Sequence, residues 1–208
     1  MNSAPQWPLK LQAVLFDMDG VLIDSQEAWM AVLAECRTRR GLEPLSVEEV
    51  RLNWGQGIAA DCTNWFVGET PAVLAIEYAQ AFRTHVGLVR VIDGAIEAVK
   101  TARTRGARTA VVTNSPRAMV EHVLTTVGIW SQFDAAACGD EVTRGKPDPA
   151  LVHLALSRLG LEPSSVVMIG DTQLDVAAAR AAGVFVVGLD TPGDARVGSL
   201  GDFRARLG

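Results

Sequence analysis

The chain has 208 residues, of which 49% are hydrophobic and 21% are charged, and its formal net charge at pH 7 is −5. This composition excludes a disordered chain, and the length suits one domain with a full hydrophobic core plus a modest insert. The negative charge argues against a nucleic-acid or membrane-surface protein, because phosphate-rich partners require a basic surface.

The three cysteines, Cys36, Cys62 and Cys138, are odd in number and have no metal-ligand spacing, so they are expected to be small buried apolar residues in a reducing compartment. The N-terminal MNSAPQWPLK lacks the pattern of a secretion signal, and no stretch reaches the roughly 18 apolar residues of a membrane span. We therefore expect a cytoplasmic protein, as a monomer or weak homodimer.

The first predicted strand, Ala13–Phe16, is continuously apolar, as is typical of a strand covered on both faces in a parallel sheet. Asp17 and Asp19 follow it, and Gly20 lets the chain turn. Because ligands of open α/β sheets bind beyond the carboxyl ends of the strands, both carboxylates are expected to face one small volume. Their mutual repulsion suggests Mg²⁺ and an acid/base pair. For Asp-x-Asp in isolation, a solvated strand end is the competing interpretation.

Residues 24–89 show helical patterns without a strand. Four helices are predicted, over 27–40, after a capping box of Ser46 and Glu49, over 58–67, and over 71–86 with Pro71 at its first position. These residues are interpreted as an inserted all-α, four-helix cap domain, and residues 1–23 and 90–208 as the core domain.

From Val91 onward, strands and helices alternate. Strands are predicted at 108–113, 133–138, 165–169 and 184–187, and helices at 93–104, after Ser115 as N-cap with Pro116 at the first helical position, and at 148–159 and 174–182. This alternation predicts an α/β fold with a Rossmann-like, mostly parallel sheet and helices on both faces. Residues 190–208 receive no assignment.

Polar residues recur where these strands end. Thr113 and Asn114 follow the second strand, Lys146 follows the third, and Asp171 and Asp175 follow the fourth. Each has an ordinary alternative: a β-branched strand residue for the threonine, a solvated loop lysine, and acids that favour a helix N-terminus. Together they supply what phosphoryl transfer requires, namely a nucleophile, a metal cradle, and hydroxyl and ammonium groups for the phosphoryl oxygens.

Four segments, FDMDGVLIDS, VVTNS, GKPDP and GDTQLDVAAARAAG, resemble in this order the signature motifs of the haloacid dehalogenase-like hydrolase superfamily. The helical insert is similar to the cap of the subgroup that contains phosphoglycolate phosphatases, β-phosphoglucomutases and phosphonoacetaldehyde hydrolases. The resemblance implies a Mg²⁺-dependent phosphatase that acts on a small phosphorylated metabolite, such as a sugar phosphate or a phosphoglycolate-like ester.

By this resemblance, Asp17 is the nucleophile that forms an aspartyl-phosphate, and Asp19 protonates the leaving alcohol and later deprotonates water. Mg²⁺ is held by the Asp17 carboxylate, the Asp19 backbone carbonyl and Asp171.

The remaining motif residues are expected to support this chemistry. Thr113 and Lys146 bind phosphoryl oxygens, Asp175 is a supporting acid that orients Lys146, and Gly20 and Asn114 contribute backbone or amide contacts to the substrate.

Departures from the family narrow the reaction. Asp19 disfavours a dehalogenase, because a halide leaving group needs no proton. The insert has no lysine for the Schiff base of a phosphonoacetaldehyde hydrolase. Trp29 stands where β-phosphoglucomutases usually carry His, and Gly170 where they carry Glu, so a mutase is the alternative to hydrolysis. A non-catalytic binding protein on the same fold is a third hypothesis.

Substrate contacts in the insert are expected from the loop Trp54, Gly55, Gln56 and Gly57, whose glycines can present an aromatic and a polar group. Weaker candidates are Arg51, Trp65 and Arg83. For each of these, tryptophan in the helical core or solvated arginine is the competing interpretation. The cap is expected to hinge between residues 23 and 91 and close over the substrate.

Overall fold

The computed structural model describes residues 6–208, and residues 1–5, assigned above to the core domain and the N-terminal stretch, lie outside the described residues. Within the described part, six strands form one parallel sheet in the order β5-β4-β1-β6-β7-β8. The strands are β1 (Ala13–Phe16), β4 (Arg108–Val112), β5 (Ala135–Ala137), β6 (Val166–Gly170), β7 (Phe185–Leu189) and β8 (Ala195–Val197). The predicted α/β fold with a mostly parallel sheet is confirmed.

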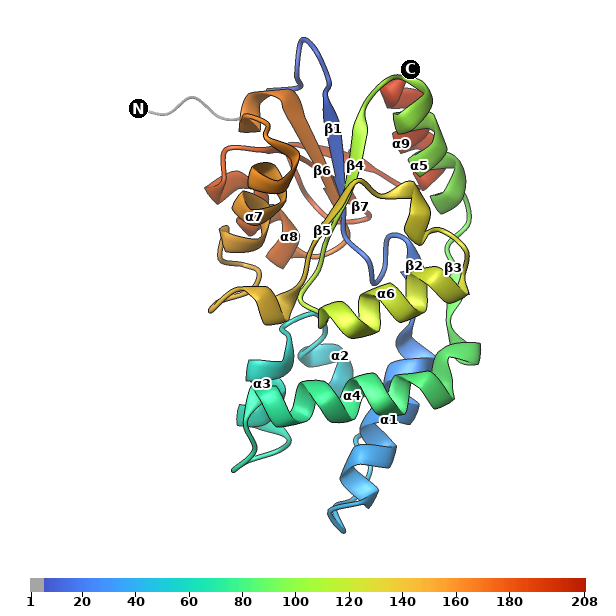
Figure 1. Ribbon diagram of the computed structural model, residues 1–208, viewed down its shortest axis with the longest axis vertical. Helices are drawn as coiled ribbons and strands as arrows, with labels where there is room; N and C mark the ends of the chain where they lie inside the picture. The colour runs from blue at the N-terminus through green and yellow to red at the C-terminus, as the bar shows by residue number, and fades with distance from the viewer. Residues whose placement is uncertain (1–5) are drawn as a thin grey trace.

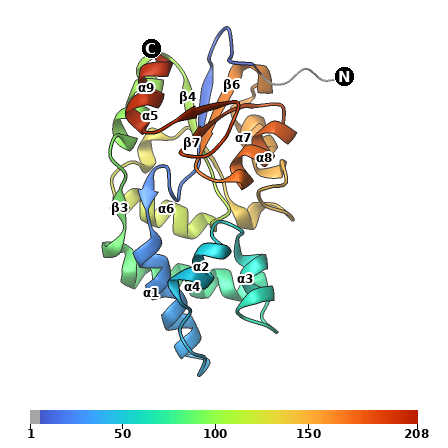
Figure 2. The same ribbon diagram turned by 180° about the vertical axis from the view of Figure 1, so that it is seen from behind.

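Helices cover both faces of this sheet (Figures 1 and 2). One face carries α5 (Ala95–Thr104), α6 (Arg117–Thr126) and α9 (Leu200–Leu207), and the other carries α7 (Ala150–Leu159) and α8 (Gln173–Ala181). Along β1, Val14 and Phe16 belong to the first hydrophobic core and Ala13 and Leu15 to the second. Because side chains alternate between the faces of a strand, β1 must be apolar at every position.

The helical insert (residues 24–89) lies beyond the carboxyl ends of the strands, as a layer below the sheet in Figure 1. Its helices are α1 (Gln26–Thr38), α2 (Val47–Leu52), α3 (Ile58–Asn64) and α4 (Pro71–His85). The capping box of Ser46 and Glu49 begins α2 as predicted. The short strands β2 (Ile23–Asp24) and β3 (Arg90–Val91) pair antiparallel, so the two ends of the insert lie side by side.

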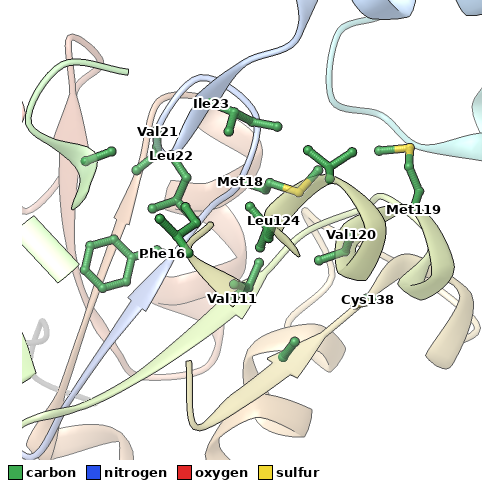
Figure 3. Packing of buried hydrophobic residues seen from close by; sticks show 14 of the residues in the cluster. Phe16, Met18, Val21, Leu22, Ile23, Val111, Met119, Val120, Leu124 and Cys138 are labelled. Carbon is green, nitrogen blue, oxygen red and sulfur yellow. The ribbon is translucent and has the colours of Figure 1, made fainter. Parts of the chain in front are cut away.

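The segment that leaves β1 is anchored by apolar packing. Met18, Val21, Leu22 and Ile23 are completely buried, in the same cluster as Met119, Val120 and Leu124 of α6. Figure 3 shows these side chains gathered around the turn that follows Phe16. This packing fixes the backbone that carries Asp17 and Asp19.

The structure corrects one prediction and adds two elements where none was predicted. Ser115 does not cap α6: Pro116 occupies the N-cap position with extended backbone, and the helix begins at Arg117. The unassigned stretch 190–208 contains β8 and α9, which complete one edge of the sheet and pack against α5. Of the cysteines, Cys36 and Cys138 are buried as expected, whereas Cys62 is only partly buried.

Over residues 6–208, no helix combines the length and apolar character that crossing a bilayer requires. A cytoplasmic location and a monomeric or weakly dimeric state stay predictions.

Candidate active site

Asp17 and Lys146 form a buried ion pair where β1 ends. The Oδ1 atom of Asp17 accepts hydrogen bonds from the Met18 backbone N–H and from Lys146 Nζ, both at 2.7 Å. Lys146 Nζ also donates to Asp175 Oδ1 at 2.6 Å and to the Val112 carbonyl at 3.3 Å. Since desolvated charges are costly unless well partnered, these contacts hold the ammonium in one position between two carboxylates.

The acids around Lys146 outnumber it. Burial alone would lower the pKa of Lys146, but Asp17 and Asp175 outweigh burial and raise it, so the ammonium stays charged. Burial and then repulsion by Asp175 raise the pKa of Asp17, against the pull of Lys146. Burial, with repulsion by Asp175, also raises the pKa of Asp171 to about 7. An added cation would favour the charged form of these acids.

The oxygen atoms available here fit Mg²⁺. Asp17, Asp171 and Asp175 place carboxylate oxygens within 4.8 Å of one another. Asp175 is already committed, because its Oδ2 accepts from Thr172 N (3.0 Å) and Thr172 Oγ1 (2.6 Å) while Oδ1 faces Lys146. By contrast, Asp171 Oδ1 is buried and finds no hydrogen-bond partner in the described chain. Asp17 and Asp171 are therefore the two carboxylates that would hold a hard cation directly.

Gly20 makes room for Asp171. Its φ of 84° is costly for other residues, and a Cβ atom there would lie 2.0 Å from Asp171 Oδ2. The structure thus brings Gly20 against the proposed metal ligand rather than into the cavity lining described below.

Asp19 is held by two serines that the sequence reasoning did not select. Ser25 Oγ, at the start of α1, donates to Asp19 Oδ1, and Ser115 Oγ donates to Oδ2 at 3.2 Å. Burial raises the pKa of Asp19, and the hydrogen bonds from Ser25 and Ser115 lower it in part. The bond to Asp19 also explains why the Ser115 side chain is not a helix cap.

Asn114 links the core to the insert. Its Oδ1 accepts from Lys146 N (2.7 Å), and its Nδ2 donates to the Lys146 carbonyl (3.0 Å) and to the Gly55 carbonyl (2.7 Å). A Cβ atom on Gly145 would lie 2.2 Å from Asn114 Oδ1, so the close approach requires glycine. Beside it, Thr113 Oγ1 accepts from Ser115 N at 3.1 Å. Because both N–H groups of the Asn114 amide and its oxygen are already engaged, Asn114 positions Lys146 and the insert loop.

A cavity lies between the sheet edge and the insert, with about 690 Å³ of atom-free space including its open mouth. The core lines it with Asp17, Asp19, Thr113, Asn114, Ser115, Pro116, Lys146 and Thr172. The insert lines it with Trp29, Leu33, Val50, Asn53, Trp54, Gly55, Gly57, Ile58, Asp61 and Trp65.

Several residues expected to face substrate do not reach the cavity. Gln56 is exposed, and its Nε2 donates to the Leu52 carbonyl at 3.3 Å, so the loop presents Trp54 and its glycines instead. Arg51 and Arg83 are also exposed and lie outside the lining.

Asp61 is the main lining residue that sequence reasoning missed. It resembles an ordinary acid in the first turn of a short helix, and its burial depends on Tyr78, 17 positions away. Only the packed structure brings the two together.

Three comparisons with known proteins identify the family and the fold of the chain. The sequence profile of the haloacid dehalogenase-like hydrolase family matches residues 14–189. The chain is 33% identical over 180 residues to N-acetylmuramic acid 6-phosphate phosphatase of Pseudomonas aeruginosa, covering 84% of this chain and 80% of that one. It is 34% identical over 188 residues to validoxylamine A 7′-phosphate phosphatase of Streptomyces hygroscopicus subsp. limoneus, covering 88% of each.

Among solved structures, CbbY of Rhodobacter sphaeroides, crystallised with phosphate, superposes with a TM-score of 0.81 at 23% identity. The match covers 93% of this chain and 96% of that one. At this identity the likeness establishes the shared fold.

Proposed function

The chain belongs to the haloacid dehalogenase-like hydrolase family, and we propose that it hydrolyses a small phosphate monoester. In this proposal the reaction passes through an aspartyl-phosphate on Asp17, with Mg²⁺ as cofactor. The relatives matched over most of their length are phosphatases, so the chain is a phosphoric monoester hydrolase. One observation carries the mechanism: Asp17 lines the cavity with Oδ1 held by Lys146, and no donor in the described chain contacts Oδ2.

In the first step, Asp17 Oδ2 attacks phosphorus, and the bond between phosphorus and the alcohol oxygen breaks. Asp19 gives its proton to that oxygen, so the alcohol leaves neutral. Lys146, fixed against Asp17, reduces the repulsion between the carboxylate and the anionic ester. When bound, Mg²⁺ supplies further positive charge at the same place.

In the second step, water attacks the phosphorus of the aspartyl-phosphate and passes a proton to the Asp19 carboxylate. The bond between phosphorus and Asp17 breaks, releasing inorganic phosphate and restoring both acids. Ser25 and Ser115 keep Asp19 in position for both proton transfers. Thr113, at the cavity wall, is proposed to bind a phosphoryl oxygen.

We further propose that residues 24–89 act as a cap domain on a core domain of residues 1–23 and 90–208. Closure would exclude water until the second step, and the β2–β3 ribbon is the candidate hinge. The Asn114 bond to the Gly55 carbonyl supports a closed arrangement, because it joins the two parts at the wall of the cavity.

Two features favour hydrolysis over the mutase alternative. A Cβ atom at Gly170 would lie 2.3 Å from Asp175 Cβ, so the glutamate expected in a mutase would displace Asp175 from Lys146. Trp29 packs edge-on against Tyr78 (5.2 Å between ring centroids) and Phe82 (4.9 Å), and an imidazole would leave part of that space empty.

The test is phosphate release from sugar phosphates, phosphoglycolate, nucleotides and p-nitrophenyl phosphate, with Mg²⁺ or EDTA. Wild type is compared with Asp17→Asn and with the control Glu162→Gln. Glu162 is an exposed acid that precedes β6, at the amino ends of the strands and away from the site. We expect Mg²⁺-dependent release by wild type and control, and loss of about a thousandfold or more in Asp17→Asn. Isomerisation of glucose 1-phosphate without release would favour the mutase, and no reaction would favour a binding protein.

A further inference from the structure

The two walls of the cavity differ in chemical character. The core wall carries carboxylates, hydroxyls and the Lys146 ammonium, which suits the phosphoryl end of a substrate. The wall supplied by the helical insert is mostly apolar, with three tryptophans and the aliphatic residues Leu33, Val50 and Ile58. Within the described chain, the insert contributes no lysine, arginine or histidine to the lining. The alcohol portion of the ester must therefore lie against this insert wall.

Asp61 is the acidic residue of the insert wall. It is 9% exposed and lines the cavity from α3. Its Oδ2 accepts a hydrogen bond from the Tyr78 hydroxyl at 3.0 Å, and no other donor in the described chain contacts the carboxyl. Its backbone carbonyl accepts from Trp65 N (2.8 Å) and Phe66 N (3.0 Å). The backbone of Asp61 is thus fixed, and its carboxyl has one side-chain partner and acceptor capacity left over.

The partner of Asp61 is equally fixed. Tyr78 is completely buried, and its ring packs edge-on against Trp29 (5.2 Å) and Phe66 (6.1 Å). Burial raises the pKa of Asp61 to about 7, and the bond from Tyr78 offsets this only in part. A buried carboxyl with a single donor costs stability, so a further donor brought by a ligand would stabilise it.

We propose that Asp61 is a specificity-determining residue that accepts a hydrogen bond from a hydroxyl or amino group on the alcohol portion of the substrate. The cavity then selects phosphate esters of neutral or amino-bearing ring polyols over esters that carry a carboxylate. This inference rests on the proposed phosphatase activity and names the substrate class of the same site.

The selection has two physical causes. The flat faces of Trp29, Trp54 and Trp65 suit the apolar face of a ring, while Asp61 satisfies its polar edge. A carboxylate on the substrate would be taken out of water beside Asp61, with no cationic side chain of the insert to pair with it.

The test compares kcat/KM for four esters: glucose 6-phosphate, glucosamine 6-phosphate, 6-phosphogluconate and p-nitrophenyl phosphate, each with Mg²⁺. Wild type should prefer the first two over 6-phosphogluconate by about tenfold or more. In Asp61→Leu, which has a similar shape and no acceptor, the values for the two ring esters should fall about tenfold, the value for 6-phosphogluconate should rise, and that for p-nitrophenyl phosphate should change less than about threefold.

Tyr78→Phe is the matched control, because it removes the hydrogen bond to Asp61 and keeps the carboxyl. It should retain the preference for the ring esters, which a purely structural role for the pair does not predict. Equal losses on all four esters in both variants would overturn the proposal. A wild-type preference for 6-phosphogluconate would do so without any variant. If wild type releases no phosphate even from p-nitrophenyl phosphate, the proposed function fails and this inference with it.

Discussion

The core wall and the insert wall of the cavity differ in how many polar groups they carry and in how those groups are linked. In the core, Lys146 contacts two carboxylates, and Asp175 uses both oxygens. On the insert wall, Asp61 has one side-chain partner among mostly apolar neighbours.

We infer from this difference that the core wall carries out the chemistry and the insert wall determines the selectivity. The core network, in which Lys146 fixes Asp17 and Asp175, serves every ester alike because it acts on the phosphoryl group common to all of them. A wall of apolar faces with one carboxyl discriminates by the shape and polarity of the alcohol. Core substitutions should therefore reduce activity on all esters equally, and insert substitutions should change the ratio between them.

The largest effect is expected for Lys146→Met. It leaves Asp17 and Asp175 buried without their ammonium, so kcat/KM should fall about a thousandfold on every ester and unfolding free energy by about 3 kcal/mol. Steady-state kinetics on two unlike esters and urea unfolding measure both effects, with the exposed Lys100→Met as control. A loss of activity on only one ester would contradict the assignment of the phosphoryl chemistry to the core wall and of the selectivity to the insert wall.

A smaller effect is expected for Gly20→Ala. The added Cβ atom collides with Asp171, whereas Gly106→Ala introduces the same backbone strain (φ of 80°) with no atom within 4 Å. We expect Gly106→Ala to cost about 1 kcal/mol of stability with normal activity. Gly20→Ala should lose about a hundredfold in kcat and need more Mg²⁺ for half-maximal activity. Equal behaviour of the two variants in a Mg²⁺ titration would remove Asp171 from the proposed metal site.

The smallest effect concerns pH and the insert wall. The folded-state pKa of Asp61 is about 7 against an ordinary value of 3.8, so the folded protein binds more protons than the unfolded chain between these values. The stability contributed by this group is therefore present at low pH and lost as pH rises through about 7. Relative to wild type, Asp61→Asn should gain about 2 kcal/mol of unfolding free energy between pH 5 and pH 8. If the difference in unfolding free energy between Asp61→Asn and wild type is the same at pH 5 and pH 8, the pKa of Asp61 is not raised in the folded protein.

The sequence predicted those parts of the fold that have local causes. β1 and β6 are apolar at every position because both faces of the sheet are covered, and the capping box of Ser46 is a local pattern. β8 escaped prediction because Arg196 is exposed and only Val197 is buried, so the edge strand has no apolar run. The ribbon of β2 and β3 is too short to leave a pattern.

In the candidate site too, residues whose position has a local cause could be predicted, and residues placed by long-range contacts could not. The motif acids and Lys146 could be placed because the carboxyl ends of parallel strands meet at one edge. Gln56 was misplaced because its direction depends on how the loop docks on Asn114, and Asp61 was missed because its burial comes from another helix. Contacts between the insert and the core are long-range, and residue spacing does not encode them.

The most direct test of the central claim is to trap the covalent intermediate in Asp19→Asn with p-nitrophenyl phosphate and Mg²⁺. The p-nitrophenolate group leaves without a proton, so Asp17 should become phosphorylated, while the lost base slows hydrolysis. Acid quenching, borohydride reduction and peptide mass spectrometry should then find homoserine at position 17. Phosphate release by this variant with position 17 unmodified, or a phosphoryl group on another residue, would contradict the account.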